Sequence, residues 1–294
     1  MPIALGIAAA VLWGTADFLA RFGTREIGAY RTLLYMQCVG VSVLTIWLAY
    51  DGELASVWAA HSRTFWAWVV FSGTLSTVAT LGFYRSLEIG TLSIVAPVCS
   101  VYPALTLLLS MYTGEHVTWT QIAGIFVSIL GVALAATSFA PRSTDVIEPG
   151  ARPQGHLTRG VGLALMASAL YGLNFWVIGY HVATHVSAAM SVWTVRVPGT
   201  LLLLLFAAPA KQTIRFPTGR IWWWIVGTGI FDSGAFLVSS LGLRTGRVSV
   251  VTVIGSLFSA VTVFLAWIVL RERLERTQWL GIFLIFVGII LVST

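Results

Sequence analysis

Long apolar runs dominate this chain and exclude most soluble folds. A helix that crosses the hydrocarbon core of a bilayer needs roughly 20 mostly apolar residues. Charged residues make up only 10% of the 294 positions, against about 25% in soluble domains. The runs are too long for barrel strands, which would show about ten residues of alternating polarity. The sequence therefore predicts an all-α, polytopic membrane protein. Ten transmembrane helices are expected at residues 3–20, 32–50, 65–84, 91–112, 120–137, 160–180, 188–208, 221–241, 248–270 and 277–292.

The chain contains an internal repeat. Residues 120–137 and 277–294 are identical at eight of 18 aligned positions without a gap, and both glycines of each copy match. Earlier in each half, the 14 residues from Ser93 align with those from Ser249, which places Tyr102 opposite Phe258. At the front of each half, Leu12–Trp13–Gly14 matches Leu170–Tyr171–Gly172. The same order of matches along both halves indicates a duplicated unit.

The only long polar stretch lies between the two copies and carries three prolines and mixed charges. It is typical of an exposed linker. We therefore expect a first five-span repeat at residues 1–138, a linker at 139–159 and a second five-span repeat at 160–294. Because five is odd, the second repeat must enter the membrane from the opposite side. Inverted repeats of this kind are a known transporter architecture, with substrate bound near the midplane between the halves.

The basic residues are distributed unequally between the two sides of the membrane. Loops after odd-numbered spans carry 13 Arg or Lys residues, and the other loops carry three. The positive-inside rule then places the first set in the cytoplasm and both termini outside. Although the formal net charge is +6, the basic residues sit at the ends of apolar runs and form no stripe, so we expect no nucleic-acid partner.

Three charged residues fall within predicted spans: Asp17, Arg196 and Asp232. A charge in hydrocarbon is costly, so such residues usually face a cavity or a partner. Arg196 and Asp232 lie near the middle of their spans and are positioned to pair. Two interpretations stay open, a structural ion pair between helices or a site that handles substrate or protons. Asp17 lies near the predicted end of its span, and two interpretations stay open for it as well: its carboxylate reaches interfacial water, or it has a functional role in the site.

Aromatic and polar residues recur at matching positions of the two halves. Trp13 and Asp17 share one face of the first span, and Tyr171 and Asn174 share the corresponding face of the sixth. A mostly apolar pocket with a few polar groups requires such a mixture; helix–helix packing is the alternative. The expected substrate-binding residues are Trp13, Asp17, Tyr84, Tyr102, Tyr171, Asn174, Trp193, Arg196, Asp232, Ser239 and Ser240.

Several kinds of chemistry have no visible motif. There is no Walker loop, so ATP is not expected to drive the protein directly. No catalytic residues, cofactor or metal site are expected, since the histidines form no ligand cluster and no nucleophile–base pair is visible. Cys38 and Cys99 lie in apolar runs and are interpreted as small apolar residues. A membrane-embedded enzyme acting on lipid or isoprenoid stays the alternative to a transporter.

Three further motifs recur along the chain: Trp13–Gly14 in the first span, and Glu115 and Glu272, each followed by a Gln-x-x-Gly pattern, at 121–124 and 278–281. Together with ten spans in two inverted halves, these motifs resemble the EamA type of the drug/metabolite transporter superfamily. The resemblance covers essentially the whole chain, and within the superfamily the chain is most similar to YddG-type exporters of aromatic amino acids.

The resemblance implies a secondary transporter or facilitator that exports amino acids or related small metabolites by alternating access. It implies a multi-pass protein of the bacterial inner membrane. The expected partners are a small-molecule substrate and the lipid bilayer, and the protein is expected to function as a monomer. It also implies that both termini are cytoplasmic, whereas the count of basic residues predicts the reverse. Exact substrate and proton coupling stay open.

Overall fold

The fold is helical. The computed structural model describes residues 2–58, 62–114, 118–138, 156–243, 254–271 and 274–293. A single pair of two-residue strands accompanies the helices within these ranges. The elements are α1 (Pro2–Ile27), α2 (Ala29–Tyr50), the 3-10 helix η1 (Glu53–Trp58), α3 (Arg63–Ile89), α4 (Leu92–Cys99), α5 (Tyr102–Ser110), the 3-10 turn η2 (Met111–Thr113), α6 (Trp119–Ala136), β1 (Thr137–Ser138), β2 (His156–Leu157), α7 (Val161–Val177), the π-helix η3 (Ile178–Val182), α8 (Ala188–Phe206), α9 (Arg220–Leu243), α11 (Phe258–Leu265), the π-helix η4 (Ala266–Leu270) and α12 (Arg276–Ser293).

Seven stretches of helix are long and apolar enough to cross a membrane in the described part of the chain. Three further apolar helices, Trp119–Ala135, Ile254–Leu270 and Arg276–Leu291, are shorter. Large apolar side chains such as Phe126, Leu205 and Phe283 point outward and are more than half exposed. An apolar exterior of this kind is stable only against lipid, so the chain is a multi-pass membrane protein.

The predicted fourth span, residues 91–112, is not one continuous helix. α4 ends at Cys99, Ser100 and Val101 form a turn, and α5 begins at Tyr102. Pro97 and Pro103 flank this break, and each proline removes a backbone donor from the helical ladder. The Ser100 hydroxyl donates to the Pro97 carbonyl oxygen at 2.8 Å. The break is therefore buried in protein and internally hydrogen-bonded, as membranes require.

α1 is longer than predicted, and this changes the position of Asp17. The helix continues through Arg21 and Arg25 to Ile27. Both arginines donate to carbonyl oxygens at the end of α3, Arg21 to Leu87 and Arg25 to Gly90. The expectation that Asp17 lies near a helix end and reaches interfacial water is wrong, because α1 continues ten residues beyond Asp17, held by these contacts with the end of α3. Asp17 is buried within the bundle, 8% exposed.

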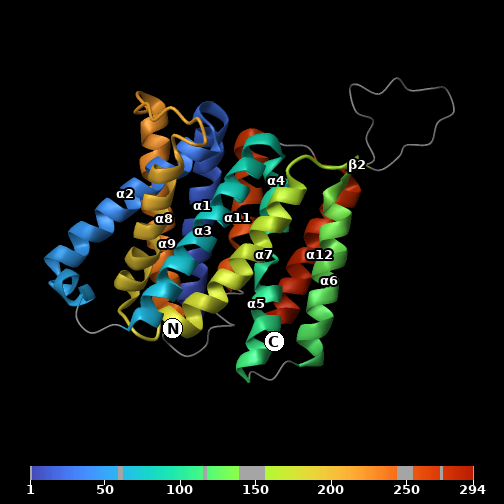
Figure 1. Ribbon diagram of the computed structural model, residues 1–294. Coiled ribbons are helices and arrows are strands. Elements are labelled where there is room, and N and C mark those ends of the chain that lie inside the picture. Colours follow the sequence, from blue (N-terminus) through green and yellow to red (C-terminus); the bar gives the residue numbers. More distant parts are fainter. Residues whose placement is uncertain are drawn as a thin grey trace.

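The helices form a bundle with one distinct edge pair (Figure 1). α6 and α12, the helices with the repeated sequence, pack along each other at that edge. On the opposite side α2 leans outward beside α8 and α9. Between these flanks lie α1, α3, α4, α5, α7 and α11, and α1 packs mainly against α9 and α11.

β1 and β2 pair antiparallel, Thr137 opposite Leu157 and Ser138 opposite His156. The pair joins the end of α6 to the start of α7, and most of the predicted linker between them lies outside the described residues. Glu115 and Glu272 also lie outside them. Both chain ends lie at the end of the bundle opposite the strand pair (Figure 1).

Candidate functional site

Two adjoining cavities lie inside the bundle. The first encloses about 550 Å³ of empty space and the second about 420 Å³, counting the space at their mouths. They share four wall residues, Thr80, Phe175, Asp232 and Phe236. The two cavities are therefore neighbouring compartments of one candidate site.

An ion pair between Arg196 on α8 and Asp232 on α9 forms part of the wall of the first cavity. The Arg196 side chain is 7% exposed and the Asp232 side chain 14%. The other terminal guanidinium nitrogen, Nη1, lies 3.6 Å from the Met36 sulfur, and the guanidinium carbon lies 5.3 Å from the centre of the Phe236 ring. The sulfur is a weak acceptor, so Asp232 is the principal partner of this cation.

Arg196 has one further donor without a partner. Its Nε is buried and makes no hydrogen bond in the described structure. A buried, unsatisfied donor costs about 1–3 kcal/mol, more when the group is charged. Gly40 provides the space beside the guanidinium, because a Cβ there would lie 3.1 Å from Nη1 of Arg196 and 2.5 Å from the Ser233 hydroxyl. The cavity therefore holds a cation whose hydrogen-bonding capacity is only partly used.

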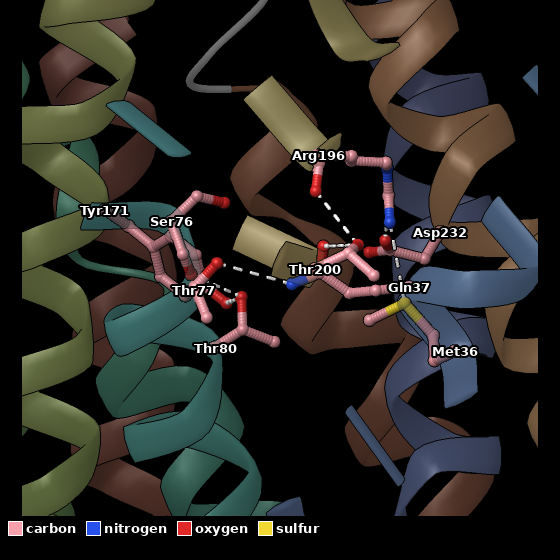
Figure 2. A network of polar contacts seen from close by, with 9 residues as sticks. All are labelled: Met36, Gln37, Ser76, Thr77, Thr80, Tyr171, Arg196, Thr200 and Asp232. Carbon is pink, nitrogen blue, oxygen red and sulfur yellow. Dashed lines mark hydrogen bonds and ion pairs between the residues drawn. The ribbon is translucent and has the colours of Figure 1, made fainter. Parts of the chain in front are cut away.

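A chain of polar contacts extends from Arg196 toward α3 and α7 (Figure 2). Thr200 donates to the Arg196 carbonyl oxygen at 2.9 Å and to the Gln37 amide oxygen at 3.3 Å. Gln37 in turn donates to Thr77 at 3.4 Å. On the other side of the site, Tyr171 donates to Thr80 at 2.8 Å. Gln37 thus bridges α3 and α8 beside the ion pair, which restrains the backbone that carries Arg196.

The second cavity is mainly aromatic. Trp13 contacts Phe175 and Phe236 edge-on, with ring centres 6.0 and 5.1 Å apart, and Tyr102 stacks on Phe175 at 4.9 Å. These distances suit favourable aromatic pairing. Two carboxylates, Asp17 and Asp232, share this aromatic enclosure. An apolar ring would find stacking surfaces here, next to a small number of charged groups.

The structure brings nine of the eleven predicted site residues to these cavities. Arg196, Ser239 and Ser240 line the first cavity, and Asp232 lines both. The residues of the second cavity include Trp13, Asp17, Tyr84, Tyr102 and Tyr171.

The other two predicted residues lie elsewhere. Asn174 is fully buried, and its side-chain oxygen accepts a hydrogen bond of 2.7 Å from Ser72 on α3. Trp193 donates from its indole nitrogen to Thr45 on α2 at 2.8 Å. Neither is among the residues that line the two cavities. Both tie helices together across the bundle, which is the packing interpretation that the sequence left open.

Several wall residues were not predicted. Phe175 and Phe236 stack with rings 6.2 Å apart between the two compartments, and single phenylalanines in apolar helices carry no distinguishing signal. Gln37 and the threonines at 77 and 80 also line the first cavity. Gln37 did offer a signal, because an amide side chain near the middle of a span needs a buried partner.

No group of three His, Cys, Asp or Glu side chains that could hold a metal ion occurs in the described ranges. Cys38 and Cys99 are free thiols, the first half-buried and the second buried. The chemistry that the site offers is therefore recognition by one guanidinium, two carboxylates, hydroxyl groups and aromatic faces.

Known proteins resemble the chain at the level of both sequence and fold. An uncharacterised protein of Methanocaldococcus jannaschii is 28% identical over 138 residues, which cover 46% of this chain and 96% of that protein. A solved crystal structure matches with a TM-score of 0.71 and 18% identity, over 99% of this chain and 95% of the other. At that identity the likeness is one of fold alone.

The model of the EamA-like transporter family matches residues 1–137 and 158–294. The two stretches together cover nearly the whole chain and leave out residues 138–157, which include most of the segment predicted as a linker. The helices that this match covers are apolar on their outer surface, and they enclose a cavity with a buried charge pair. The chain therefore belongs to the EamA-like transporter family.

Proposed function

We propose that this protein is a secondary transporter that exports amino acids with large apolar, above all aromatic, side chains, or closely related small metabolites. It works by alternating access in the bacterial inner membrane and functions as a monomer. Members of its family are transporters of small molecules. The proposal adds the substrate class, the direction and the mechanism.

One observation carries the substrate class: a buried arginine with an unused donor stands beside an aromatic enclosure. A free amino acid brings a carboxylate and an ammonium group, and burying either unpaired is costly. Arg196 offers its guanidinium to the carboxylate. The aromatic faces of Trp13 and Tyr102 offer stacking to the side chain. An aliphatic metabolite without a carboxylate would leave the Arg196 donor unused.

Reciprocal contacts between the sequence halves support the inverted repeat. Thr106 donates to the Gly172 carbonyl oxygen at 3.0 Å, and Thr262 donates to the Gly14 carbonyl oxygen at 3.2 Å. The alignment matches Thr106 with Thr262, and Gly14 with Gly172. Each half therefore makes the same contact with the other half, as expected for two units related by a two-fold axis.

The direction of the first helix in each half also supports inversion. At the end of α1, Arg25 donates to Gly90 at 3.2 Å. A Cβ on Gly90 would lie 2.6 Å from the carbonyl oxygen of Arg159, just before α7 begins. The C-terminal end of α1 therefore lies beside the N-terminal end of α7. The first helices of the two halves thus begin at opposite ends of the bundle, as inversion requires. Counting the three shorter apolar helices as spans gives ten crossings, five in each half.

The relative from Methanocaldococcus jannaschii supports a five-span unit as well. Almost its whole length aligns with less than half of this chain. A unit of that length exists as a separate chain, as expected if the present chain arose by duplication of such a unit. Rocking of one half against the other around the shared cavity is then the simplest route to alternating access.

Proteoliposomes test the function. Purified protein should release preloaded labelled phenylalanine down its gradient, faster than it releases glycine, which has no ring to stack. Arg196→Lys keeps the charge and loses the fork-shaped donor set, so it should slow release about tenfold, equivalent to ~1.4 kcal/mol. Lys211→Arg, at an exposed turn before α9, is the matched control and should behave as wild type. Release no faster than from protein-free liposomes, for every amino acid tested, would reject the proposal.

A further inference from the structure

A third cavity lies at one end of the bundle, apart from the two central ones. It is larger than either of them and encloses about 1470 Å³ of empty space, counting the space at its mouth. Its walls come from the end of α1, the start of α9 and the end of η4, and it shares no residue with the first two cavities. It is therefore a site of its own, separate from the proposed binding of substrate.

The charges in this cavity are not balanced. Arg21, Arg25 and Arg220 line it together with a single carboxylate, that of Glu26. Arg21 is buried and donates to the carbonyl oxygen of Leu87. Glu26 makes no ion pair with any residue that the structure describes. Three cations against one anion leave an excess of positive charge, and a concave surface of one sign attracts ions of the opposite sign. The cavity therefore favours an anionic ligand.

Two of these arginines have hydrogen-bond donors to offer such a ligand. Arg25 is exposed and donates from Nη2 to the Gly90 carbonyl oxygen at 3.2 Å, which leaves most of its N–H groups available. Arg220 is exposed as well, and its guanidinium carbon lies 5.1 Å from the centre of the Trp224 ring. It makes no hydrogen bond or ion pair within the described part of the chain. Arginine binds phosphate oxygens through paired N–H groups, so a phosphate suits both side chains.

Aromatic packing holds Arg220 in place. Phe22 on α1 stacks on Trp224 on α9, with ring centres 5.0 Å apart and planes inclined by 19°. Phe18, one turn earlier on α1, contacts Phe22 edge-on at 5.3 Å. Trp224 in turn contacts the guanidinium of Arg220. Since the cation rests on a stack anchored in another helix, it loses less conformational freedom when an anion binds.

One wall of the cavity continues into the lipid-facing surface. Val269 on η4 lines the cavity and is more than half exposed. Trp267 and Ile268, just before it, are also more than half exposed. Exposed apolar side chains of this kind face hydrocarbon, and tryptophan is enriched at the level of the lipid headgroups. A ligand in this cavity therefore meets arginine on one side and the bilayer on the other.

The repeat indicates that the basic cluster is not part of the duplicated scaffold. α7 is the counterpart of α1, and the alignment that matches Trp13 with Tyr171 places Gly179 opposite Arg21 and Ala183 opposite Arg25. Residues 176–187 contain no arginine or lysine. The positive-inside rule accounts for basic residues near span ends, but not for their convergence from α1 and α9 on one cavity. The cluster is an asymmetric feature of one end of the bundle.

We propose that this cavity binds one anionic phospholipid, such as phosphatidylglycerol. The lipid phosphate lies between Arg25 and Arg220, and Arg21 adds positive charge to the wall. The glycerol backbone and acyl chains pass Val269 and Leu270 into the bilayer. Basic pockets between transmembrane helices are a known means of recognising anionic headgroups. Because α1 belongs to the first half of the chain and α9 to the second, the lipid links the two halves and stabilises the bundle.

Thermal unfolding in a neutral detergent tests the site. Dioctanoyl phosphatidylglycerol should raise the melting temperature of the delipidated protein by several degrees. Dioctanoyl phosphatidylcholine has the same chains and no net charge, so it should not. Arg220→Gln removes charge-assisted hydrogen bonds and should raise the phosphatidylglycerol concentration needed for half the shift about tenfold. Lys211→Gln removes an exposed charge from the loop before α9, is the matched control, and should respond as wild type.

Three results would overturn the proposal. The first is an equal response to the two lipids, and the second is a wild-type response in Arg220→Gln. The third concerns the source of the phosphate. Glycerol 3-phosphate carries the phosphate without acyl chains and should give no shift at the lipid concentrations used. If it shifts the melting temperature as much as phosphatidylglycerol does, the cavity is a site for soluble phosphate esters and not for lipid.

Bound lipid is also measurable directly. Protein extracted from vesicles of equal parts phosphatidylglycerol and phosphatidylcholine should retain the anionic lipid, enriched several-fold in native mass spectra. Arg25→Gln with Arg220→Gln should lose this enrichment. The matched control, Lys211→Gln with Arg63→Gln, removes two exposed charges elsewhere and should keep it. If the first double variant does not fold, Arg220→Gln alone decides, because its side chain bonds to no described residue. Equal retention of both lipids by the wild type would contradict the proposal.

Discussion

Gly131 on α6 lies directly against Gly281 on α12, since a Cβ on Gly131 would lie 2.7 Å from the carbonyl oxygen of Gly281. A second contact repeats this one, because a Cβ on Gly288 would lie 2.7 Å from the carbonyl oxygen of Gly124. Gly124 matches Gly281 in the repeat, and Gly131 matches Gly288. The two helices therefore pack backbone to backbone, as small residues permit within membranes.

Alanine at these glycines should destabilise the protein. Gly131→Ala or Gly281→Ala forces a methyl group against backbone atoms that cannot move aside, so each should cost about 1–3 kcal/mol. Thermal unfolding in detergent should show lowered melting temperatures. Gly162→Ala is the matched control, because Gly162 is in α7 and its Cβ would meet no atom within 4 Å. Its better helix propensity should leave stability unchanged or raise it by up to about 1 kcal/mol. Equal effects at all three positions would contradict the packing argument.

The Arg196–Asp232 pair should respond differently to single and double replacement. Arg196→Gln or Asp232→Asn alone leaves the other charge buried and unpaired, which should cost about 3–5 kcal/mol of stability. The double replacement removes both charges and should recover most of that loss. Unfolding in detergent measures the three variants, and a double-mutant cycle gives the coupling between the residues.

Transport by the same double variant separates the two interpretations of the pair. As a substrate clamp, the pair opens when the substrate carboxylate binds Arg196. The double variant should then fold and yet lose most zwitterion transport. Transport at the native rate would mean that the pair is only a link between α8 and α9.

The long apolar runs were sufficient to predict most helices, because hydrocarbon thickness sets a minimum length that sequence displays directly. Their ends were less predictable. α1 and α3 both extend further than their apolar cores, to Ile27 and Ile89. The cause is tertiary, since Arg21 and Arg25 of α1 donate to carbonyl oxygens at the end of α3. The sequence of one helix alone cannot reveal where it ends when the end is set by contacts with another helix.

The site residues that the sequence could predict were those whose charge is unusual within an apolar span. Charges within spans pointed to Arg196 and Asp232, which form the expected ion pair. Phe175 and Phe236 were missed, since their role depends on which way each helix turns in the bundle. Asn174 was placed on the cavity face by its spacing from Tyr171. It instead bonds to Ser72 on α3, because the direction of a side chain depends on its neighbours as well as on its position along the helix.

Aromatic residues of the second cavity should determine substrate preference. Trp13→Ala and Tyr171→Ala each remove a ring from the wall, and lost stacking is worth about 0.5–1.5 kcal/mol beyond the lost area. Phenylalanine transport should fall several-fold while transport of leucine falls less. Tyr171→Phe keeps the ring and loses only the hydrogen bond to Thr80, so it should retain the preference. Unchanged transport of every substrate in both alanine variants would rule out these residues as stacking partners.

The orientation of the chain in the membrane is testable at residue 150, in the predicted linker. The loops after odd-numbered spans carry 13 of the 16 basic residues compared above. Arg21 is buried and donates to Leu87. Without Arg21 the count is still twelve basic residues against three, so the positive-inside rule predicts that the loops after odd-numbered spans, with the linker, are cytoplasmic. The strand pair β1–β2 lies at the same end, opposite both termini (Figure 1).

A single cysteine distinguishes the two orientations. Cys38 and Cys99 are first replaced by alanine, and Gly150→Cys then supplies the only thiol. If the linker is cytoplasmic, a membrane-impermeant maleimide should leave this thiol unlabelled in intact cells and label it after the cells are opened. A cysteine at Asp51, at the other end of α2 from Arg31, should show the opposite pattern and serves as the control. Labelling at position 150 in intact cells would instead place the linker outside and both termini in the cytoplasm. The excess of basic residues in the loops after odd-numbered spans would then need an explanation other than the positive-inside rule.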